Sequence, residues 1–350
     1  MNLVDIVSLG TERLASDIHI TVGRPITLRI NGDLVSQGEE PLTPNDTKSL
    51  VYEALNERLL GVLEEKGEID SSYSNPGVGR YRINAFKQRG SYGMVLRIIP
   101  LTIPTMEWLG LPEVVTDLAR LRRGMVLVTG PTGSGKSTTL ASMVDLINHE
   151  RNCHILTLED PIEYLHKHNK ALVTQREVGS DTFSFANALR AALRQDPDVI
   201  LVGEMRDLET ISIALTAAET GHLVFSTLHT SGAAKTIDRI IDVFPPHQQQ
   251  QVRVQLSSVL QGIISQQLLP KPSGKGRVGA YEIMIATTAI RNLIREDKIH
   301  QIDTSIQTGA SYKMQTMDNS LVGLYKKGVI SKDTALINAI NKEQIKKYIL

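Results

Sequence analysis

The sequence predicts an α/β fold with two domains, a smaller α+β one over residues 1–99 and a larger one over residues 113–350. In the larger region, strand-like and helix-like segments alternate, which is typical of a parallel sheet flanked by helices. In the smaller region, pairs of strand-like segments are joined by short turns. Between the two, residues 100–112 contain three prolines and few periodic residues, so we expect a linker there.

The first region is expected to consist of two strand pairs and two helical segments. The expected segments are a short amphipathic helix carrying Leu3, Ile6, Val7 and Leu14, strands at 18–22, 26–30, 80–86 and 92–98, and a helix at 44–66. The pair Asn31-Gly32 after the second strand is a hairpin-turn signal. Either Thr43 or Asn45 has the side chain to cap the second helix.

The second region begins with an alternating series. Its expected strands are 125–129, 154–158, 199–203 and 223–228, and its expected helices are 136–148, 184–194 and 208–219. After Pro245-Pro246 we expect mostly helices, with one strand near residues 277–285. The tail, residues 331–350, reads as helical with mixed charge.

The composition limits the classes of protein that the chain can belong to. Lys and Arg number 38 and Asp and Glu also 38, so the basic excess typical of a dedicated nucleic-acid binder is missing. The single cysteine, Cys153, cannot form an internal disulfide or a multi-cysteine zinc site. The start of the chain lacks the pattern of a signal peptide, and no apolar run approaches the ~20 residues of a membrane helix. We therefore expect a cytoplasmic protein that reaches a membrane only through partners.

The most specific motif is a phosphate-binding loop, G-x-x-x-x-G-K-[ST], between an apolar strand-like stretch and a helix-like one. Its residues, and the helix residue that follows, are Gly130, Pro131, Thr132, Gly133, Ser134, Gly135, Lys136, Ser137 and Thr138. Glycines let backbone N–H groups converge on phosphate oxygens. Lys136 is expected at the β- and γ-phosphates and the Ser137 hydroxyl at Mg²⁺. The sequence therefore predicts that the chain binds a nucleoside triphosphate with Mg²⁺.

Two acidic segments follow predicted strands of the same sheet. The strand at 198–204 ends in Gly203-Glu204, so Ser137 is expected to hold the metal with Glu204 acting through water. The segment 159–163 offers Glu163 as a general base for the attacking water. The alternative readings are a strand that ends at a surface Glu and acids that cap a helix.

Two histidines, His222 and His229, bracket the strand at 223–228. Their odd spacing places them on opposite faces of one regular strand, which argues against a shared metal. A lone histidine is often structural. A histidine beside the γ-phosphate could instead sense whether hydrolysis has occurred, and His229 is the candidate for nucleotide contact.

Together these segments resemble the secretion-superfamily ATPases over nearly the whole chain, and among them the retraction ATPases of type IV pili. The resemblance rests on the P-loop, the acidic segment 159–163, the Gly203-Glu204 strand end, a His box at 220–230 and an N-terminal signature at 15–19. The segment 289–294 reads AIRNLI and resembles a motif needed for retraction. Its Ile290, Leu293 and Ile294 form an inward stripe, leaving Arg291, Asn292 and Arg295 outside.

The resemblance implies a hexameric ring with an N-terminal PAS-like domain and a C-terminal RecA-like domain. In that family the nucleotide lies between the two domains, and arginines of the N-terminal domain complete the site. Arg82 and Arg97 lie on the strands where such arginines are expected, with Arg80 and Arg89 as competitors. An arginine of this kind contributes about 10³–10⁵ in rate.

The expected function is ATP-driven retraction of type IV pili. We expect the motor at the cytoplasmic face of the inner membrane, where it would act on an inner-membrane platform protein, with a second, accessory ATPase as a further partner. Two absences favour retraction over pilus assembly or type II secretion: an extra N-terminal domain and a four-cysteine insert. Two rivals stay open. A nucleic-acid translocase is disfavoured by zero net charge and 4% aromatic residues, and a nucleotide-dependent assembly switch would not need hydrolysis.

Overall fold

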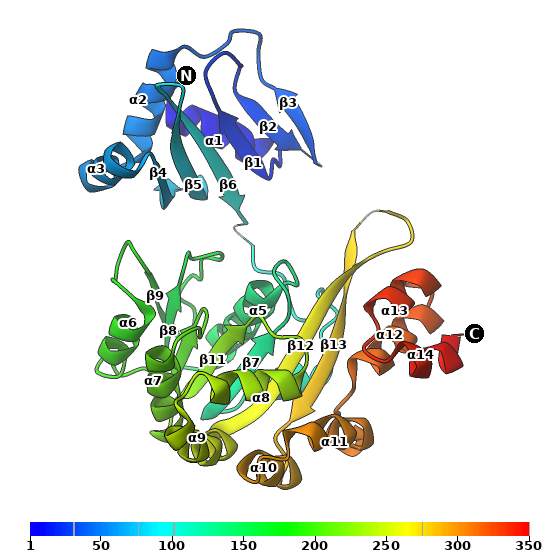
Figure 1. The fold of residues 1–350 in the computed structure, drawn as a ribbon. Coiled ribbons are helices and arrows are strands. Elements are labelled where there is room, and N and C mark those ends of the chain that lie inside the picture. Colours follow the sequence, from blue (N-terminus) through cyan, green and yellow to red (C-terminus); the bar gives the residue numbers. More distant parts are fainter. Residues whose placement is uncertain (31, 76, 101, 275, 350) are drawn as a thin grey trace. The chain divides into compact units, whose positions relative to one another are not determined.

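The structure is a computed structural model that describes residues 1–30, 32–75, 77–100, 102–274 and 276–349. Its contacts divide the chain into two units, Met1–Thr102 with Glu163–Leu165, and Ile103–Ile162 with His166–Leu350. We call them the N-terminal and the C-terminal unit and describe each by itself (Figure 1).

The N-terminal unit is a six-stranded antiparallel sheet with three helices, in the strand order β3-β2-β1-β6-β5-β4. The elements are α1 (Leu3–Glu12), β1 (Asp17–Ile20), β2 (Thr27–Ile30), β3 (Asp33–Ser36), α2 (Pro44–Ala54), α3 (Glu57–Lys66), β4 (Glu68–Asn75), β5 (Gly79–Gln88) and β6 (Ser91–Ile99). Leu28, Ile18, Leu96 and Ile83 lie opposite one another in successive strands and are all fully buried. The helices pack on this face and make one core with it.

The sequence predicted this unit correctly in outline and wrongly in several places. The expected helix over 44–66 is two helices, because the chain leaves the helical conformation at Leu55 and Asn56 caps a new helix through its bond from Leu59 N. Thr43, rather than Asn45, caps the first. Leu14 lies beyond α1 and is 86% exposed, so it is not part of the apolar stripe.

Two strands of the N-terminal sheet were missed. These are β3, whose four residues are all solvent-exposed, and β4, whose polar sequence EIDSSYSN carries little strand signal. The antiparallel pairing of Ile30 with Asp33 agrees with a hairpin turn, although Asn31 of the predicted Asn31-Gly32 turn lies outside the described residues.

The C-terminal unit contains a seven-stranded sheet in the order β13-β12-β7-β11-β10-β8-β9, parallel except for β13. The strands are β7 (Gly124–Thr129), β8 (His154–Glu159), β9 (Leu172–Glu177), β10 (Val199–Val202), β11 (Leu223–Leu228), β12 (Leu260–Pro270) and β13 (Arg277–Ile285). Side chains of β7 alternate between two cores, with Met125 and Leu127 on one face and Val126 and Val128 on the other. The parallel sheet with two covered faces confirms the predicted α/β class.

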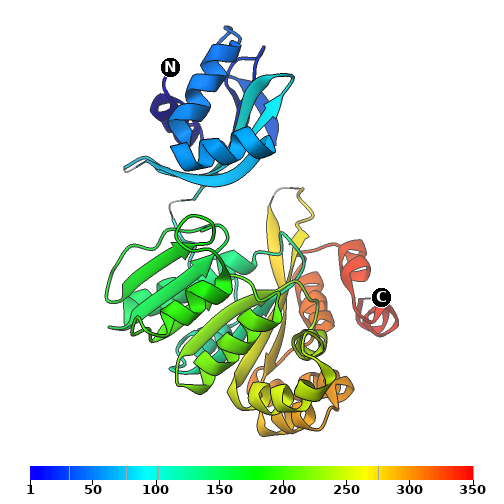
Figure 2. The same ribbon diagram turned by 60° about the vertical axis from the view of Figure 1, so that its left-hand side comes forward.

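Helices cover both faces and one edge of this sheet (Figures 1 and 2). One core takes in α4 and α5, the opposite one takes in α6 to α11, and α12 to α14 pack on β12 and β13. The helices are α4 (Glu113–Ala119), α5 (Lys136–Glu150), α6 (Phe185–Ala192), α7 (Leu208–Glu219), α8 (Ala233–Asp242), α9 (Pro246–Val259), α10 (Thr288–Arg295), α11 (Ile302–Thr308), α12 (Met317–Lys326), α13 (Lys332–Asn338) and α14 (Lys342–Ile349).

The prediction of mostly helices after Pro245-Pro246 was wrong for residues 260–270. This segment is β12, which lies between the P-loop strand β7 and β13. Its sequence LQGIISQQLLP mixes apolar and glutamine residues without a strict period, so only its pairing with two neighbours identifies it as a strand. The short strand β9 was also missed.

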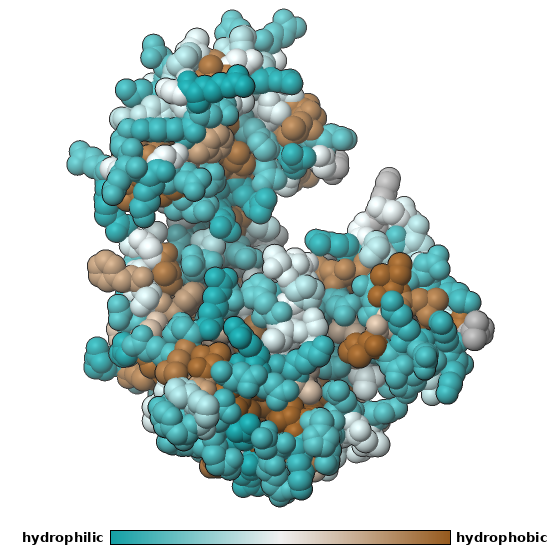
Figure 3. Space-filling view, in the orientation of Figure 1, coloured by the Kyte–Doolittle hydropathy of each residue, from teal (hydrophilic) through white to brown (hydrophobic). Residues whose placement is uncertain are grey.

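The surface drawn in Figure 3 is mostly hydrophilic, with separate hydrophobic spots. Among the described residues, none of the helices combines the length and hydropathy that a bilayer span requires.

Candidate nucleotide-binding site

The P-loop connects the carboxyl end of β7 to the N-terminus of α5, as the motif requires. Gly130, Gly133 and Gly135 have φ values of +143°, +76° and +89°, which are left-handed conformations that glycine adopts without strain. At Gly130 a Cβ atom would lie 2.3 Å from the carbonyl oxygen of Gln266, so this position has no room for a side chain. The loop can therefore turn its backbone N–H groups towards a bound anion.

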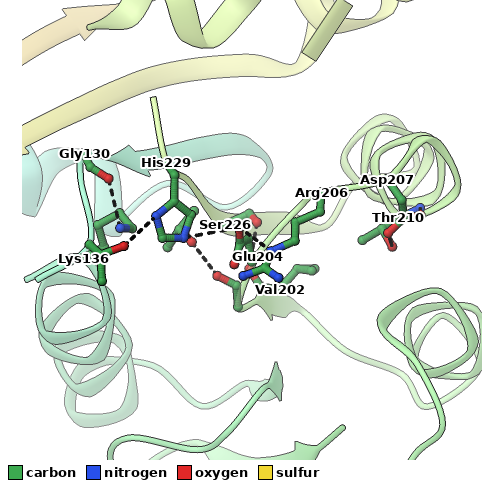
Figure 4. A network of polar contacts seen from close by, with 12 residues as sticks. Gly130, Lys136, Val202, Glu204, Arg206, Asp207, Thr210, Ser226 and His229 are labelled. Carbon is green, nitrogen blue, oxygen red and sulfur yellow. Dashed lines mark hydrogen bonds and ion pairs between the residues drawn. The ribbon is translucent and has the colours of Figure 1, made fainter. Parts of the chain in front are cut away.

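Lys136 is the first residue of α5 and is only 8% exposed. Its ammonium donates to the carbonyl oxygens of Gly130 at 3.0 Å and Pro131 at 3.2 Å, so the side chain folds back over the loop (Figure 4). Ser137 follows on the first turn of the helix and is half-buried. This arrangement places an ammonium and a hydroxyl at the helix N-terminus, where the dipole favours anions.

The P-loop is held from the neighbouring strand by Gln266, a residue that the sequence reasoning missed. Gln266 is 2% exposed and lies on β12. Its amide nitrogen donates to the carbonyl of Ser134 at 2.6 Å, and its amide oxygen accepts from the hydroxyl of Thr139 at 2.9 Å. One buried side chain thus joins the middle of the loop to the first turn of α5.

The donor set of this loop suits a phosphate. The Ser134 hydroxyl oxygen is buried and has no hydrogen-bond partner among the described residues. An unsatisfied buried hydroxyl is costly in the absence of a ligand. Together with the crowded Gly130 and the buried Lys136, it fits the anion cradle that the motif predicts.

Glu204 follows shortly after the end of β10, the strand that pairs with β11. The segment that carries it is held by β11, since the hydroxyl of Ser226 donates to Val202 O at 2.7 Å and that of Thr227 to Gly203 O at 2.6 Å. The backbone of Gly203 lies against β8, where a Cβ atom would be 3.2 Å from Leu158 O. The carboxylate follows one residue later, on Glu204.

His229 connects Glu204 to the P-loop (Figure 4). Its Nε2 lies 3.3 Å from Glu204 Oε1, and its Nδ1 lies 3.4 Å from the Thr132 hydroxyl. Glu204 also pairs with Arg206 at 2.7 Å. Burial opposes ionisation of Glu204, but the hydrogen bond and charge of Arg206 and the interaction with His229 outweigh it, and the pKa of Glu204 lies below its ordinary value. The site thus holds an ionised carboxylate.

The other histidine, His222, takes no part in this contact. Its Nδ1 lies 2.9 Å from Ala217 O and 3.2 Å from the Thr220 hydroxyl, at the start of β11. The two histidines are at opposite ends of the strand.

The acidic segment divides into structural and exposed groups. Glu159 accepts from Thr157 at 2.7 Å and Gln175 at 3.2 Å. The buried Glu177, at the end of β9, accepts from Ile162 N at 3.0 Å and so fixes the backbone of the acidic segment to the end of β9. Glu163 is exposed and belongs to the short segment Glu163–Leu165 of the N-terminal unit. Its role as a general base stays a prediction.

Arg82 and Arg97 lie directly opposite each other on β5 and β6. Both are exposed, with side chains 44% and 69% accessible, and each has an acidic neighbour: Asp70 at 3.9 Å from Arg82 and Asp17 at 2.9 Å from Arg97. Their role in completing the site stays a prediction.

The competing arginines, Arg80 and Arg89, have different surroundings. The half-buried guanidinium of Arg80 donates to the hydroxyls of Ser74 and Ser72 at 3.0 and 2.9 Å, whereas Arg89 lies in the turn between β5 and β6 with φ +49°.

In the segment 289–294 the structure corrects one expectation. Ile290 and Ile294 are buried and Leu293 is partly buried, as predicted. Arg291, however, is not on a solvated face: its guanidinium donates to Ser257 O at 2.6 Å, Ser258 O at 2.9 Å and Ala286 O at 2.9 Å. The arginine neutralises the carbonyl end of α9, where the helix dipole favours a cation. Such a role needs two segments far apart in sequence, which periodicity cannot detect.

Comparison with known proteins shows which family the chain resembles. The family model described as type II/IV secretion system protein matches residues 111–327. The type IV pilus retraction ATPase PilT of Pseudomonas aeruginosa is 53% identical over 96% of this chain and 97% of its own length. A twitching motility protein of Neisseria gonorrhoeae is 50% identical over 91% of this chain and 85% of its own. A crystal structure of the pilus retraction motor PilT with bound ADP superposes with a TM-score of 0.93 at 53% identity, covering 99% of both chains.

Proposed function

The chain belongs to the type II/IV secretion system protein family, and we propose that it is an ATP-hydrolysing motor that retracts type IV pili. The observation that carries the ATPase part is the connection from Thr132 of the P-loop through His229 to the ionised Glu204. The direction of the motor, retraction, is supported by likeness to a retraction ATPase over nearly the whole chain.

Binding of the nucleotide relies on the P-loop. Its backbone N–H groups and Lys136 would hold the phosphates, with Lys136 leaving the carbonyls of Gly130 and Pro131 for the β- and γ-phosphates. The hydroxyl of Ser137 and, through water, the carboxylate of Glu204 would hold Mg²⁺. The metal, when bound, neutralises charge that develops on the phosphates.

Hydrolysis needs a base and cations around the γ-phosphate. Glu163 would take the proton of the attacking water, a role worth about 10²–10⁴ in rate. Arg82 and Arg97 would stabilise the charge of the transition state. His229, which contacts both the P-loop and Glu204, would move when phosphate leaves. Work then comes from contacts that differ between the nucleotide states.

The assembly and the partners follow from the same proposal. Six copies would form a ring in the cytoplasm, at the cytoplasmic face of the inner membrane. The ring would act on the membrane-embedded platform protein of the pilus, with a second ATPase of the same family as an accessory. Nucleic acid is not among the proposed partners, in keeping with the zero net charge.

The enzymatic part is tested with the purified full chain. Glu163→Gln and Glu204→Ala should each lower kcat for ATP about 100-fold or more, while calorimetric titration should show ADP still bound. The control is Glu343→Gln, an exposed acid on α14 far along the chain from the P-loop. Near-normal turnover in both site variants would contradict the assigned roles.

The cellular part is tested in source cells that lack the gene. Retraction predicts excess surface pili and no twitching, restored by the wild-type gene and not by the Glu163→Gln gene. Cells without pili would indicate assembly instead. Full rescue by the hydrolysis-dead gene would favour an assembly switch, and ATPase stimulated by single-stranded DNA would favour a translocase.

A further inference from the structure

The segment that carries Glu163 has no helix or strand of its own. Residues 160–171, all of which the structure describes, connect the end of β8 to the start of β9 without regular secondary structure. The segment leaves the sheet beside the strand that leads to Glu204, because Gly203 N donates to Leu158 O at 2.7 Å. A general base must lie within about 3 Å of the proton that it takes. Contacts outside helices and strands must therefore hold this segment in place.

Two side chains of β9 hold the backbone on either side of Glu163. The carboxylate of Glu177 accepts from the backbone N–H of Ile162 at 3.0 Å. The amide oxygen of Gln175 accepts from the backbone N–H of His166 at 2.8 Å. Because Ile162 and His166 are separated by only three residues, Glu163 among them, this short stretch is held at both ends.

Both side chains project from the face of the sheet that α5 covers. Gln175 and Glu177 are two positions apart on β9, so they lie on the same face. Val173, two positions before Gln175, belongs to the core that takes in α5. Since α5 begins with Lys136 of the P-loop, the segment is held over the same face of the sheet as the helix that follows the phosphate-binding loop.

The amide of Gln175 has a fixed orientation. Its nitrogen donates to Glu159 Oε1 at 3.2 Å, and the same carboxylate oxygen accepts from the Thr157 hydroxyl at 2.7 Å. With the amide nitrogen turned towards a carboxylate, the amide oxygen faces His166 N. Thr157 lies opposite Gln175 in the parallel register of β8 and β9. The pairing of these two strands therefore sets the position of the acceptor for His166 N.

The carboxylate of Glu177 is more deeply buried. Glu177 is 3% exposed and Ile162 is 4% exposed, so water does not readily replace the hydrogen bond between them. The second carboxylate oxygen of Glu177 accepts from the Ser180 hydroxyl at 3.1 Å. Removal of this side chain would leave the Ile162 N–H buried without this acceptor, and the backbone before Glu163 would shift to find another.

We propose that Glu177 and Gln175 are positioning residues for ATP hydrolysis, which hold the backbone on both sides of Glu163 so that its carboxylate meets the attacking water. Both act through Glu163 rather than on the nucleotide. The inference rests on the proposed function, in which Glu163 is the general base, and adds the residues that fix the place of that base.

The first test is a double-mutant cycle on the purified full chain, with Glu177→Met, Glu163→Gln and both together. Glu177→Met should lower kcat roughly 10- to 100-fold, because a displacement of about 1 Å costs up to that much, and should leave the Kd for ADP within about threefold. The double variant should turn over no more slowly than Glu163→Gln alone, since Glu177 acts through Glu163. Losses that multiply, or wild-type turnover in Glu177→Met, would overturn the proposal.

The second held position gives an independent cycle. Gln175→Met removes the acceptor for His166 N and should show the same loss of kcat and the same lack of additivity with Glu163→Gln. Because Gln175 is only half-buried, this variant carries the test if Glu177→Met does not fold. The matched control is Leu172→Ala at the other end of β9, which is 55% exposed in wild type and should turn over ATP at the wild-type rate.

A conservative variant separates the hydrogen bond from the mere presence of a buried polar side chain. In Glu177→Gln the amide oxygen can still accept from Ile162 N, while the amide nitrogen donates to the Ser180 hydroxyl, which accepts as well as donates. This variant should therefore recover most of the rate that Glu177→Met loses. Glu177→Gln as slow as Glu177→Met would count against the proposal.

Hydrogen exchange then tests the positioning itself. The amides of residues 162–166 should exchange about tenfold faster in Glu177→Met and in Gln175→Met than in wild type, and Glu177→Gln should restore most of the protection. Slower turnover with unchanged protection of this segment would overturn the proposal while leaving the ATPase intact. Near-wild-type turnover in Glu163→Gln would instead contradict the proposed role of Glu163, and this inference with it.

Discussion

Replacing Gln266 by alanine should weaken both the fold around the P-loop and its binding of nucleotide. The substitution removes the donor to Ser134 O at 2.6 Å and the acceptor for the Thr139 hydroxyl at 2.9 Å. Because Gln266 is 2% exposed, both former partners stay buried and unsatisfied. Each such group costs about 1–3 kcal/mol, so for the two groups we expect a loss of about 2–6 kcal/mol in the free energy of unfolding of this unit.

The affinity for nucleotide should fall as well, because the loop must then be ordered by the ligand itself. A loss of about 1.4 kcal/mol in binding corresponds to a tenfold rise in Kd, and we expect at least that. Calorimetric unfolding gives the stability, and calorimetric titration with ADP gives the Kd. The two-unit chain need not unfold in one step, so the transition that ADP shifts is the one to compare.

The matched control for this prediction is the next residue along β12. Gln267→Ala removes an amide oxygen that has no hydrogen-bond partner among the described residues. We expect it to change stability and Kd little. If Gln266→Ala bound ADP as tightly as Gln267→Ala and unfolded at the same temperature, the assignment of Gln266 as the residue that holds the P-loop would be refuted.

Three further predictions concern single positions. Gly130→Ala should lower the thermal unfolding temperature far more than Gly133→Ala. The new Cβ atom would lie 2.3 Å from a carbonyl oxygen at position 130, whereas at position 133 no neighbouring atom lies within 4 Å of it. Equal shifts in unfolding temperature would contradict this. Arg291→Met should cost about 2 kcal/mol in stability, since the carbonyls of Ser257, Ser258 and Ala286 lose a charged donor, while the exposed Arg295→Ala should stay within about 0.5 kcal/mol. Burial opposes ionisation of Glu204, but its partners hold its pKa below 4.5. Its contribution to the free energy of unfolding should therefore be complete at neutral pH and be lost only below pH 4.5. The measurement is the stability of wild type and Glu204→Gln across pH, and a difference between them that is already lost above pH 4.5 would contradict the prediction.

The sequence was informative wherever a local pattern carries the structure. The P-loop needs glycines at fixed spacing and a lysine at a helix start, and both are visible in eight consecutive residues. The alternation around β7, α5 and β8 was read correctly because buried parallel strands are short apolar runs. The strand β12 was missed since its glutamines become buried only through partners on other segments, as Gln266 does.

The same difference separates the motif residues by role. The stripe of Ile290 and Ile294 follows from helical period alone, whereas the contacts of Arg291 with Ser257 O and Ser258 O join residues more than thirty positions apart. Arg82 and Arg97 could be named from the sequence only by family resemblance. Their position opposite each other became visible through the register of β5 and β6.

By itself the sequence predicted the fold class, the phosphate-binding loop and the candidates Glu204 and His229, because each prediction depends on residues close together in the chain. The tertiary structure decided which of these meet: that His229 links Thr132 to Glu204, that Gln266 holds the loop, and that Glu282 accepts from the start of α8. The physical reason is that a buried polar group is stable only with a partner. That partner is chosen by strand order and register, which no local pattern records.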